Sequence, residues 1–301
     1  MTDHASDIPD DGPLAGLLTA LDLTDTGART SEDISTGPSQ WMPMGRVFGG
    51  QVLAQSLVAA MRTTEADRRP HSMHGYFLRP GDVTKPITFS VDRIHDGRSF
   101  STRRTQAYQD GRPILSMIAS FQDTDEGLEH QAPMPEGIPE PESLPSARDV
   151  LSRIDHPVAA HWANDRPFDM RHVEQPVYFG AAPDRVAHQA VWIRAIGRLP
   201  DDPAVHLASL AYASDYSILE SIYRRHGLSW ATPGIKAASL DHAMWFHRFG
   251  RADEWMLYVQ ESTSAQGGRG LSLGPIYSRD GVLLASVAQE GMVRVPAQPR
   301  D

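Results

Sequence analysis

Two stretches of this sequence recur at nearly the same distance, and this repeat constrains the fold more than any other feature. The run "HGYFLRPGD" around His74 resembles "HAMWFHRFG" around His242, 168 residues later. The run "QDGRPILSMIASF", which contains Asp110, resembles "RDGVLLASVAQEG", which contains Asp280, at an offset of 170 residues between the two aspartates. Two matches at nearly one offset predict a duplicated unit, in which one long helix precedes several antiparallel strands.

The helix of the first unit is identified by its apolar composition. The run "VLAQSLVAAM", from Val52 to Met61, is apolar nearly all round. A helix of this kind is normally buried. We therefore expect an α+β fold in which two antiparallel sheets are each wrapped around a central helix.

Strand patterns and turn signals fill in the rest of each unit. Ile87, Phe89 and Val91 alternate in "PITFSVDRI" as they would in a half-buried strand. Two further strand runs meet at the Asp-Gly pair of residues 110–111, which is a strong hairpin signal. In the second half, "QAVWIRAIG", "EWMLYVQESTSA" and "RGLSLGPIYSRDGVLLASVAQEGMVRV" indicate strands, and "LASLAYASDYSILESIYRRHG" contains a helix that ends at Gly227.

A change of composition separates the two units. From Asp123 the sequence "DTDEGLEHQAPMPEGIPEPESLPSA" is rich in proline and glutamate, as in a linker or a connection that wraps over the surface. We therefore predict an N-terminal unit at residues 1–125, a linker at 126–175 and a C-terminal unit at 176–301.

Composition excludes several classes of protein. The formal net charge of -10 argues against a protein that binds nucleic acid through bulk positive charge. The absence of cysteine excludes a thiolate nucleophile and any cysteine-bound metal. The first residues, "MTDHASDIPDDGPLAG", lack the apolar run of a signal peptide, and no segment approaches the roughly 20 apolar residues of a membrane-spanning helix. The last residues, "VPAQPRD", carry no peroxisomal or retention signal, so we expect a cytoplasmic protein.

Familiar catalytic motifs are missing from the sequence. There is no G-x-S-x-G elbow for a serine nucleophile and no P-loop. The run "GGRGLSLG" from Gly267 is rich in glycine, but the predicted strands on both sides lack the strand-to-helix context of a dinucleotide site. The histidine pairs 71/74 and 242/247 do not have the spacing of a helical zinc motif, so solvated or packed histidines are the better interpretation.

Three polar residues in the second half are candidates for chemistry. Asp215, in "YASDYSILESI", precedes an apolar run, and from this stretch alone helix capping is the better interpretation, with Ser217 and Glu220 as a capping box. The alternative is an acid near a helix N-terminus that holds a water molecule. Ser239 precedes an apolar aromatic strand, and Gln289 interrupts a strand of small and apolar residues. A single polar residue in such a place is usually a satisfied interior group.

The glycines Gly49 and Gly50, in "RVFGGQVLAQSL", allow three interpretations. A phosphate cradle is disfavoured because no Lys or Thr follows as in a P-loop. A buried helix that begins in a crowded place is favoured, because glycine permits close approach and unusual φ angles. A third possibility is that the N–H groups of the helix N-terminus face an oxygen atom of a substrate.

Taken in order, nine stretches carry a specific resemblance to a known family: "RVFGGQVLAQSL", "HSMHGYFLRPGD", "DGRSFSTRR", "ASFQ", "WIRAIGRLPDD", "YASDYSIL", "SLDHAMWFHR", "ESTSAQGGRG" and "DGVLLASVAQEG". The sequence resembles the acyl-CoA thioesterase II family over nearly its whole length after about residue 12. The resemblance implies a double-hotdog fold and hydrolysis of fatty acyl-CoA to a free fatty acid and CoA. It also implies that Asp215, Ser239 and Gln289 of the C-terminal unit hold the attacking water, with Ser239 standing where the family often has threonine.

The resemblance also bears on ligands and assembly. An acyl-CoA is the implied substrate, with water as the co-substrate and no cofactor, and a homo-oligomer is implied as well. Arg269 and Gly270, in "STSAQGGRG", are our candidates for binding the phosphates of the CoA group. Acylation of Ser239 itself is an alternative mechanism. A hydroxyacyl-CoA dehydratase with a catalytic histidine and a non-catalytic acyl-CoA-binding module are alternative functions.

Overall fold

The computed structural model describes residues 12–28 and 30–296. Residues 1–11 and 297–301 lie outside the described residues. They include most of the terminal sequences "MTDHASDIPDDGPLAG" and "VPAQPRD", in which no targeting signal is expected. Within the described ranges, no helix combines the length and the apolar character that crossing a membrane requires.

The chain folds into helices and strands in two similar blocks, each with a helix before its main strands. The helices are α1 (Pro13–Leu21), α2 (Gly49–Met61), the 3-10 helix η1 (Pro141–Ser143), α3 (Ala147–Leu151), α4 (Pro157–Asn164), α5 (Pro203–Ser214) and α6 (Glu220–His226). The strands of the first block are β1 (Thr24–Asp25), β2 (Asp33–Gly37), β3 (Arg69–Phe77), β4 (Ile87–Asp96), β5 (Phe100–Gln109) and β6 (Arg112–Gln122). Those of the second are β7 (Phe168–His172), β8 (His188–Ala195), β9 (Lys236–Ser239), β10 (Asp241–Phe246), β11 (Met256–Gln266), β12 (Arg269–Ser278) and β13 (Leu283–Arg294).

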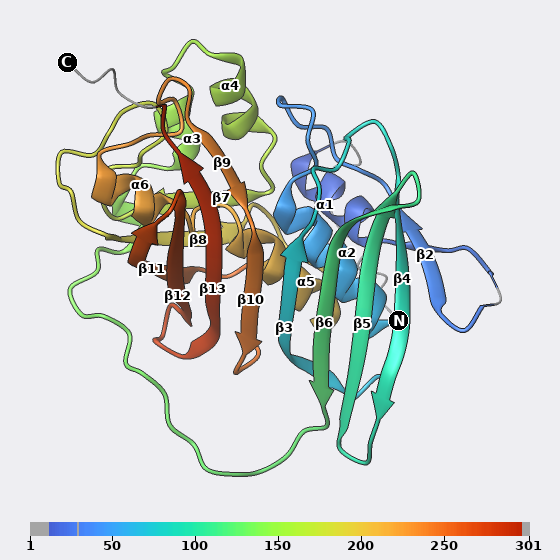
Figure 1. Ribbon diagram of the computed structural model, residues 1–301. Helices are drawn as coiled ribbons and strands as arrows, with labels where there is room; N and C mark the ends of the chain where they lie inside the picture. The colour runs from blue at the N-terminus through green and yellow to red at the C-terminus, as the bar shows by residue number, and fades with distance from the viewer. Residues whose placement is uncertain (1–11, 29, 297–301) are drawn as a thin grey trace.

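The sheets of the two halves join into one antiparallel sheet (Figure 1). The strand order is β1-β2-β4-β5-β6-β3-β10-β13-β12-β11-β8-β7, and β9 pairs with β13 beside this path. The junction is the β3–β10 pair, in which His74 lies opposite Ala243 and His242 lies opposite Gly75. The two strands that mark the sequence repeat are therefore direct neighbours. Because they are antiparallel and equivalent residues exchange places across the pair, the two halves are related by an approximate two-fold axis.

The two central helices lie against each other on one face of this sheet. In α2 every residue from Gly50 to Ala60 is buried, and in α5 every residue from His206 to Ser214 is buried. Figure 1 shows α2 and α5 behind the strands of the junction. Among the polar members of α2, Gln55 is satisfied by other segments of the chain, since its side chain donates to the carbonyl oxygens of Ala20 and Pro38, whereas the Ser56 hydroxyl is buried without a partner. The predicted buried central helices are confirmed.

The predicted hairpins are also found. Asp110 and Gly111 both have positive φ angles, 49° and 69°, which is the backbone geometry of a two-residue type I′ turn between β5 and β6. The alternating residues Ile87, Phe89 and Val91 of β4 are buried. On the other side of the molecule, β12 and β13 are joined through Gly281, whose φ is 83°.

The proline-rich connection begins directly after β6. Residues 123–140 form neither helix nor strand, and the connection runs along the edge of the molecule to the second half (Figure 1). Gln131 ties it to the turn before β13, because its side chain donates to the Gly281 carbonyl and accepts from the Leu283 N–H. The remaining part of the range 126–175 contains η1, α3, α4 and β7. The three-part division of the chain stays a prediction.

Candidate active site

The position of Asp215 is set by the end of a helix. Helix α5 ends at Ser214, and Asp215 is its C-cap residue. The next helix begins only at Glu220, where no side chain caps it. Ser217 does not serve a capping box, since its hydroxyl accepts a hydrogen bond from Gln260. The interpretation of Asp215 as an N-cap, with Ser217 and Glu220 as a capping box, is therefore wrong. The predicted helix end at Gly227 is confirmed by the left-handed φ of this residue, 63°.

Asp215, Ser239 and Gln289 lie in mutual contact, although the chain separates them by up to 74 positions. The Gln289 Nε2 group donates to Asp215 Oδ1 at 3.0 Å and to Ser239 Oγ at 2.8 Å. The Ser239 hydroxyl donates to the same Asp215 oxygen at 3.2 Å. One carboxylate oxygen, one hydroxyl and one amide therefore form a compact triangle of polar atoms.

An interruption in strand pairing brings Ser239 and Gln289 together. Strand β13 pairs with β9 from Gly291 onward and with β10 up to Ala288. Ser239 is the last residue of β9 and lies opposite Gly291. Gln289 lies on β13 at the gap between the two partners, with its side chain fully buried. Both side chains therefore reach the end of α5, where Asp215 stands.

The Gln289 amide is oriented by a histidine that the sequence interpretation used only as a repeat marker. Gln289 Oε1 is hydrogen bonded to Nδ1 of His242, and His242 Nε2 lies 3.0 Å from the Ser214 hydroxyl. Burial lowers the pKa of His242 to about 4, so the ring is neutral at pH 7. A neutral ring has one N–H, and the Gln289 oxygen requires it on Nδ1. His242 thus holds the amide with its NH₂ group toward Asp215.

The electrostatics of Asp215 reflect its burial. Desolvation raises the pKa of the carboxyl to about 6. Hydrogen bonds from Gln289 and Ser239, together with the backbone N–H of Gly50, favour the charged form and offset part of that rise. At pH 7 about nine tenths of the carboxyl groups are therefore ionised, with a basicity well above that of an ordinary aspartate.

Gly49 and Gly50 begin α2 directly against this carboxylate. A Cβ on Gly49 would lie 2.6 Å from Asp215 Oδ2, and a Cβ on Gly50 would lie 2.3 Å from the Tyr212 carbonyl oxygen. Neither glycine has a positive φ angle. The expectation of close approach is confirmed, and the expectation of an unusual φ is wrong. The N-cap residue Phe48 offers no capping side chain, and the Asp215 carboxylate accepts the first-turn N–H of Gly50 in its place.

Arg269 and Gly270 lie apart from the triangle. Arg269 Nε is 3.0 Å from Glu290 Oε1 on the exposed side of the sheet. Successive strand residues point to opposite faces, so this side is opposite to that of the buried Gln289. Gly270 lies under α6, where a Cβ would be 2.6 Å from Ile222 Cδ1. The structure does not bring these two residues to Asp215, and their role in phosphate binding stays a prediction.

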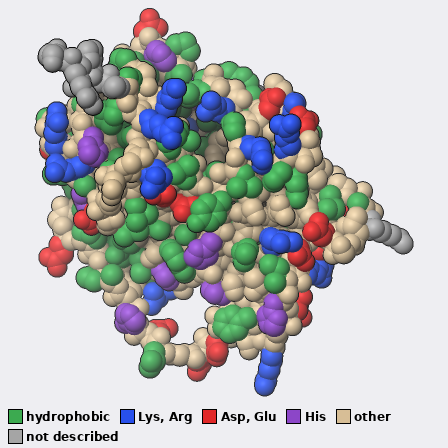
Figure 2. Space-filling model, viewed as in Figure 1, with side chains coloured by type: hydrophobic (Ala, Val, Ile, Leu, Met, Phe, Trp, Pro, Cys, Tyr) green, Lys and Arg blue, Asp and Glu red, His purple; other side chains and the backbone are tan. Residues whose placement is uncertain are grey.

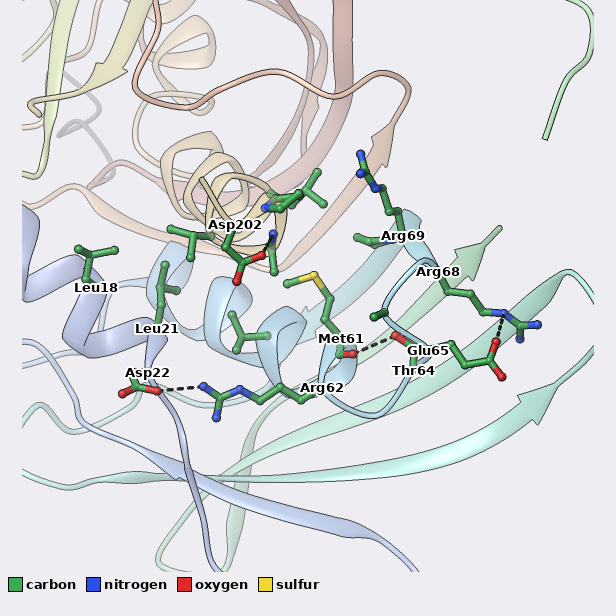
Figure 3. A pocket seen from close by; sticks show the side chains of 17 residues that line it. Leu18, Leu21, Asp22, Met61, Arg62, Thr64, Glu65, Arg68, Arg69 and Asp202 are labelled. Carbon is green, nitrogen blue, oxygen red and sulfur yellow. Dashed lines mark hydrogen bonds and ion pairs between the residues drawn. The ribbon is translucent and has the colours of Figure 1, made fainter. Parts of the chain in front are cut away.

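Among the described residues of the first half, the triangle has no equivalent at the positions that the repeat predicts. By the repeat offsets, His71 stands at the position of Ser239 and Ala119 at that of Gln289. At the far end of α2, next to the start of α5, the chain instead has a hollow of about 500 Å³ (Figure 3). Its floor includes Leu18, Leu21 and Met61, and its rim carries arginines already paired with acids, such as Arg62 with Asp22 at 3.0 Å.

Comparison with known proteins identifies the family to which this chain is similar. The family model described as acyl-CoA thioesterase matches residues 160–292, and that described as acyl-CoA thioesterase N-terminal domain matches residues 38–122. The acyl-CoA thioesterase 2 of Haemophilus influenzae is 38% identical over 267 residues, which are 87% of this chain and 92% of that protein. The human acyl-coenzyme A thioesterase 8 is 37% identical over 279 residues, with 89% and 86% covered.

Solved structures support the fold. An acyl-CoA thioesterase II from Mycobacterium marinum superposes with a TM-score of 0.75 at 38% identity, covering 95% of this chain and 100% of that one. A hot dog protein from Alicyclobacillus acidocaldarius reaches the same TM-score, 0.75, at 20% identity over 94% and 99% of the two chains. The double-hotdog fold is therefore confirmed, and the chain belongs to the acyl-CoA thioesterase family, whose members are thioester hydrolases.

Proposed function

We propose that this protein hydrolyses fatty acyl-CoA to a free fatty acid and CoA by direct attack of a water molecule held by Asp215, Ser239 and Gln289. The observation that carries the mechanism is the triangle of contacts at 2.8 to 3.2 Å between these three side chains. No covalent nucleophile is required, because the attacking oxygen comes from water.

Each member of the triangle has a distinct part in the reaction. Asp215 accepts a proton from the water as the oxygen attacks the thioester carbonyl, and its raised pKa of about 6 makes it a better base than an ordinary carboxylate. Ser239 and Gln289 hold the water in line for attack. Collapse of the tetrahedral intermediate breaks the C–S bond, and the CoA thiolate leaves and takes up a proton.

The developing negative charge on the thioester oxygen needs a donor. Helix α2 begins at Gly49, beside Asp215 Oδ2, and lacks a side-chain cap. The Gly50 N–H is bonded to the Asp215 carboxylate, so the donors left for the thioester oxygen are the other first-turn N–H groups and the positive end of the helix dipole. We assign the stabilisation of the oxyanion to this helix end, with Gly49 and Gly50 as the substrate-binding residues.

The dehydratase alternative is disfavoured at the triangle itself, because the histidine there, His242, is bonded to an amide and a hydroxyl and not to an acid. A dehydratase of this fold needs an accessible histidine with an acid. His242 is fully buried and bonded to Gln289 and Ser214. His74 lies on β3 in edge contact with Trp245, at the sheet junction.

The decisive experiment measures thiol release from short, medium and long acyl-CoAs. Wild type is compared with Asp215→Asn, Ser239→Val and Ser239→Thr. We expect release to collapse by about 10²- to 10⁴-fold for Asp215→Asn. Ser239→Val, which has the shape of threonine without the hydroxyl, should fall strongly, whereas Ser239→Thr should stay near wild type. Asp241→Asn is the matched control, because an amide oxygen can still accept the Glu290 N–H as Asp241 does.

The alternatives give different results in the same assay. Equal release by Asp215→Asn and wild type would leave a thioesterase with another base. Acyl-CoA binding by a wild type that releases no thiol would identify a binding module. A covalent acyl adduct on Ser239, detected by mass spectrometry, would reject attack by water.

We also propose that the protein forms a homo-oligomer through the exposed face of the sheet. Hydrophobic and histidine side chains gather there over β3 and β10 (Figure 2). Tyr76, Ile118 and Trp245 are exposed by 62%, 47% and 38%. Light scattering coupled to gel filtration tests this assembly, and a monomer at micromolar concentration would contradict it. The cytoplasmic location stays a prediction of the sequence.

A further inference from the structure

A positively charged side chain that has no acidic partner among the described residues, Arg166, lies over the ring of Tyr216, the chain neighbour of Asp215. The guanidinium carbon of Arg166 is 4.8 Å from the ring centroid of Trp162, 4.8 Å from that of Tyr216 and 5.9 Å from that of Tyr178. Its Nε is buried without a hydrogen-bond partner, and its Nη1 has only the sulfur of Met170, at 3.8 Å.

Arg166 has no carboxylate within 4 Å among residues 12–28 and 30–296. Its chain neighbour Asp165 is hydrogen bonded to His161 instead, at 2.7 Å. Aromatic rings attract a guanidinium, but they accept none of its in-plane N–H donors well. A partly buried arginine normally completes these bonds with a carboxylate or a phosphate. The Arg166 side chain therefore has donor capacity for an anion that the protein does not supply.

The location of Arg166 connects it to the reacting atoms. It lines a hollow of about 280 Å³ together with Gln40, Trp41, Phe48, Trp162, Tyr212 and Tyr216. Phe48 and Tyr216 stack on each other with centroids 4.7 Å apart. Phe48 directly precedes Gly49 in the chain, and Tyr216 directly follows Asp215. The wall of the hollow is therefore made by the immediate neighbours of two site residues.

We propose that this aromatic hollow is a subsite for the substrate and that Arg166 binds an anionic oxygen group carried by the thioester. The inference rests on the proposed function, because it places the thioester at Asp215. Two parts of a substrate carry such a group: a carboxylate at the far end of the acyl chain and a phosphate of CoA. Arg166 is then a specificity-determining residue, which selects among thioesters without taking part in the attack of water.

Four thioesters separate the two sources of the anion. Octanoyl and ω-carboxyoctanoyl groups are each presented on CoA and on pantetheine, which lacks the phosphates. The variants are Arg166→Met, which removes the charge at similar length, and Arg166→Lys, which keeps it. Arg194→Met is the matched control, since Arg194 also lies over an aromatic ring, that of Trp255 at 4.3 Å, but outside the hollow.

The expected result is a selective loss of kcat/KM in Arg166→Met. A loss of at least tenfold confined to the two ω-carboxy thioesters identifies the carboxylate as the partner. The same loss confined to the two CoA thioesters identifies a phosphate. Arg166→Lys should recover part of the loss in either case, and Arg194→Met should show none.

Two results would overturn the inference: an equal loss on all four thioesters, or no loss on any of them. A wild type that is folded and hydrolyses none of the four would instead reject the proposed function. If Arg166→Met does not fold, inhibition of the wild type answers the same question. Octanedioate should inhibit hydrolysis at least tenfold better than octanoate, or free CoA at least tenfold better than pantetheine, and equality in both comparisons would contradict anion binding.

Discussion

His242 donates a hydrogen bond from Nδ1 to Gln289 Oε1, and this bond decides which way the Gln289 amide faces. The Nε2 group at the other end of the amide then donates to Asp215 Oδ1 at 3.0 Å and to Ser239 Oγ at 2.8 Å. Because Gln289 is fully buried and both ends of its amide are hydrogen bonded, turning the amide over would break all of these bonds. The order of the triangle therefore depends on a residue that contacts neither Asp215 nor the substrate.

Loss of the His242 donor should lower turnover more than substrate binding. In His242→Leu the Gln289 amide can turn, and we expect kcat to fall on the order of tenfold to a hundredfold with KM nearly unchanged. His242→Asn places an amide N–H where Nδ1 stands and should recover part of the loss. His247→Asn is the control, because His247 lies after β10 and bonds to Ser286 at 2.9 Å. A His242→Leu variant with wild-type kcat would show that Gln289 needs no orientation.

The rate should depend on pH through Asp215. Burial raises the pKa of this carboxyl to about 6, and only the ionised form accepts a proton from water. We expect kcat to rise about tenfold per pH unit below pH 6 and to level off above pH 7. In His242→Asn the rising limb should keep its position, because the pKa of His242, about 4, lies below this range. A limb centred near pH 4, or a flat profile from pH 5 to 7, would contradict this assignment.

The burial of Asp215 should also lower the free energy of unfolding whenever its carboxyl is ionised. Its folded-state pKa of about 6 exceeds the ordinary value of 3.8, so the folded protein binds the proton more tightly than the unfolded chain. The stability gained from the neutral form is fully present below pH 3.8 and is lost as the pH rises through 6. Asp215→Asn should therefore raise the free energy of unfolding by up to about 3 kcal/mol at pH 8 and by almost nothing at pH 3.5.

Urea unfolding of wild type and Asp215→Asn across this pH range measures the difference. An equal stability difference at pH 3.5 and pH 8 would mean that the carboxylate is not buried as described. Asp241→Asn serves again as the control, since no comparable dependence is expected there.

Much of the fold could be predicted from the sequence because its signals are local. The period of two in Ile87, Phe89 and Val91 and the Asp-Gly turn at residues 110–111 each depend on a few adjacent residues. The repeat predicted two similar halves, but not that β3 and β10 pair directly, because the register of strands 168 residues apart has no local signal.

The site was harder to predict for the same reason. Asp215 precedes an apolar run, which is typical of an N-cap, yet the helix it belongs to ends there, and its carboxylate turns to Gln289 on a distant strand. The resemblance to the family supplied that grouping, and the residue pattern alone did not. His242 and Arg166 went unnoticed as site residues because their partners come from other elements, and no motif surrounds them.

Gly49 and Gly50 should respond differently to the addition of one methyl group. On Gly50 the new Cβ meets the Tyr212 carbonyl oxygen at 2.3 Å, and backbone cannot move aside without separating α2 from α5. On Gly49 it meets Asp215 Oδ2 at 2.6 Å and the end of the Phe77 ring at 3.0 Å, both of which are side-chain atoms. We therefore expect Gly50→Ala to lose stability by about 1–3 kcal/mol or more, and Gly49→Ala to stay folded while its activity falls.

Thermal unfolding and thiol release, measured on both variants, test this pair. Gly16→Ala, a helical glycine whose added Cβ has only ordinary contact at 3.6 Å with Gln40, is the control for the substitution itself. A Gly49→Ala variant with wild-type turnover would mean that the start of α2 does not constrain the carboxylate during catalysis.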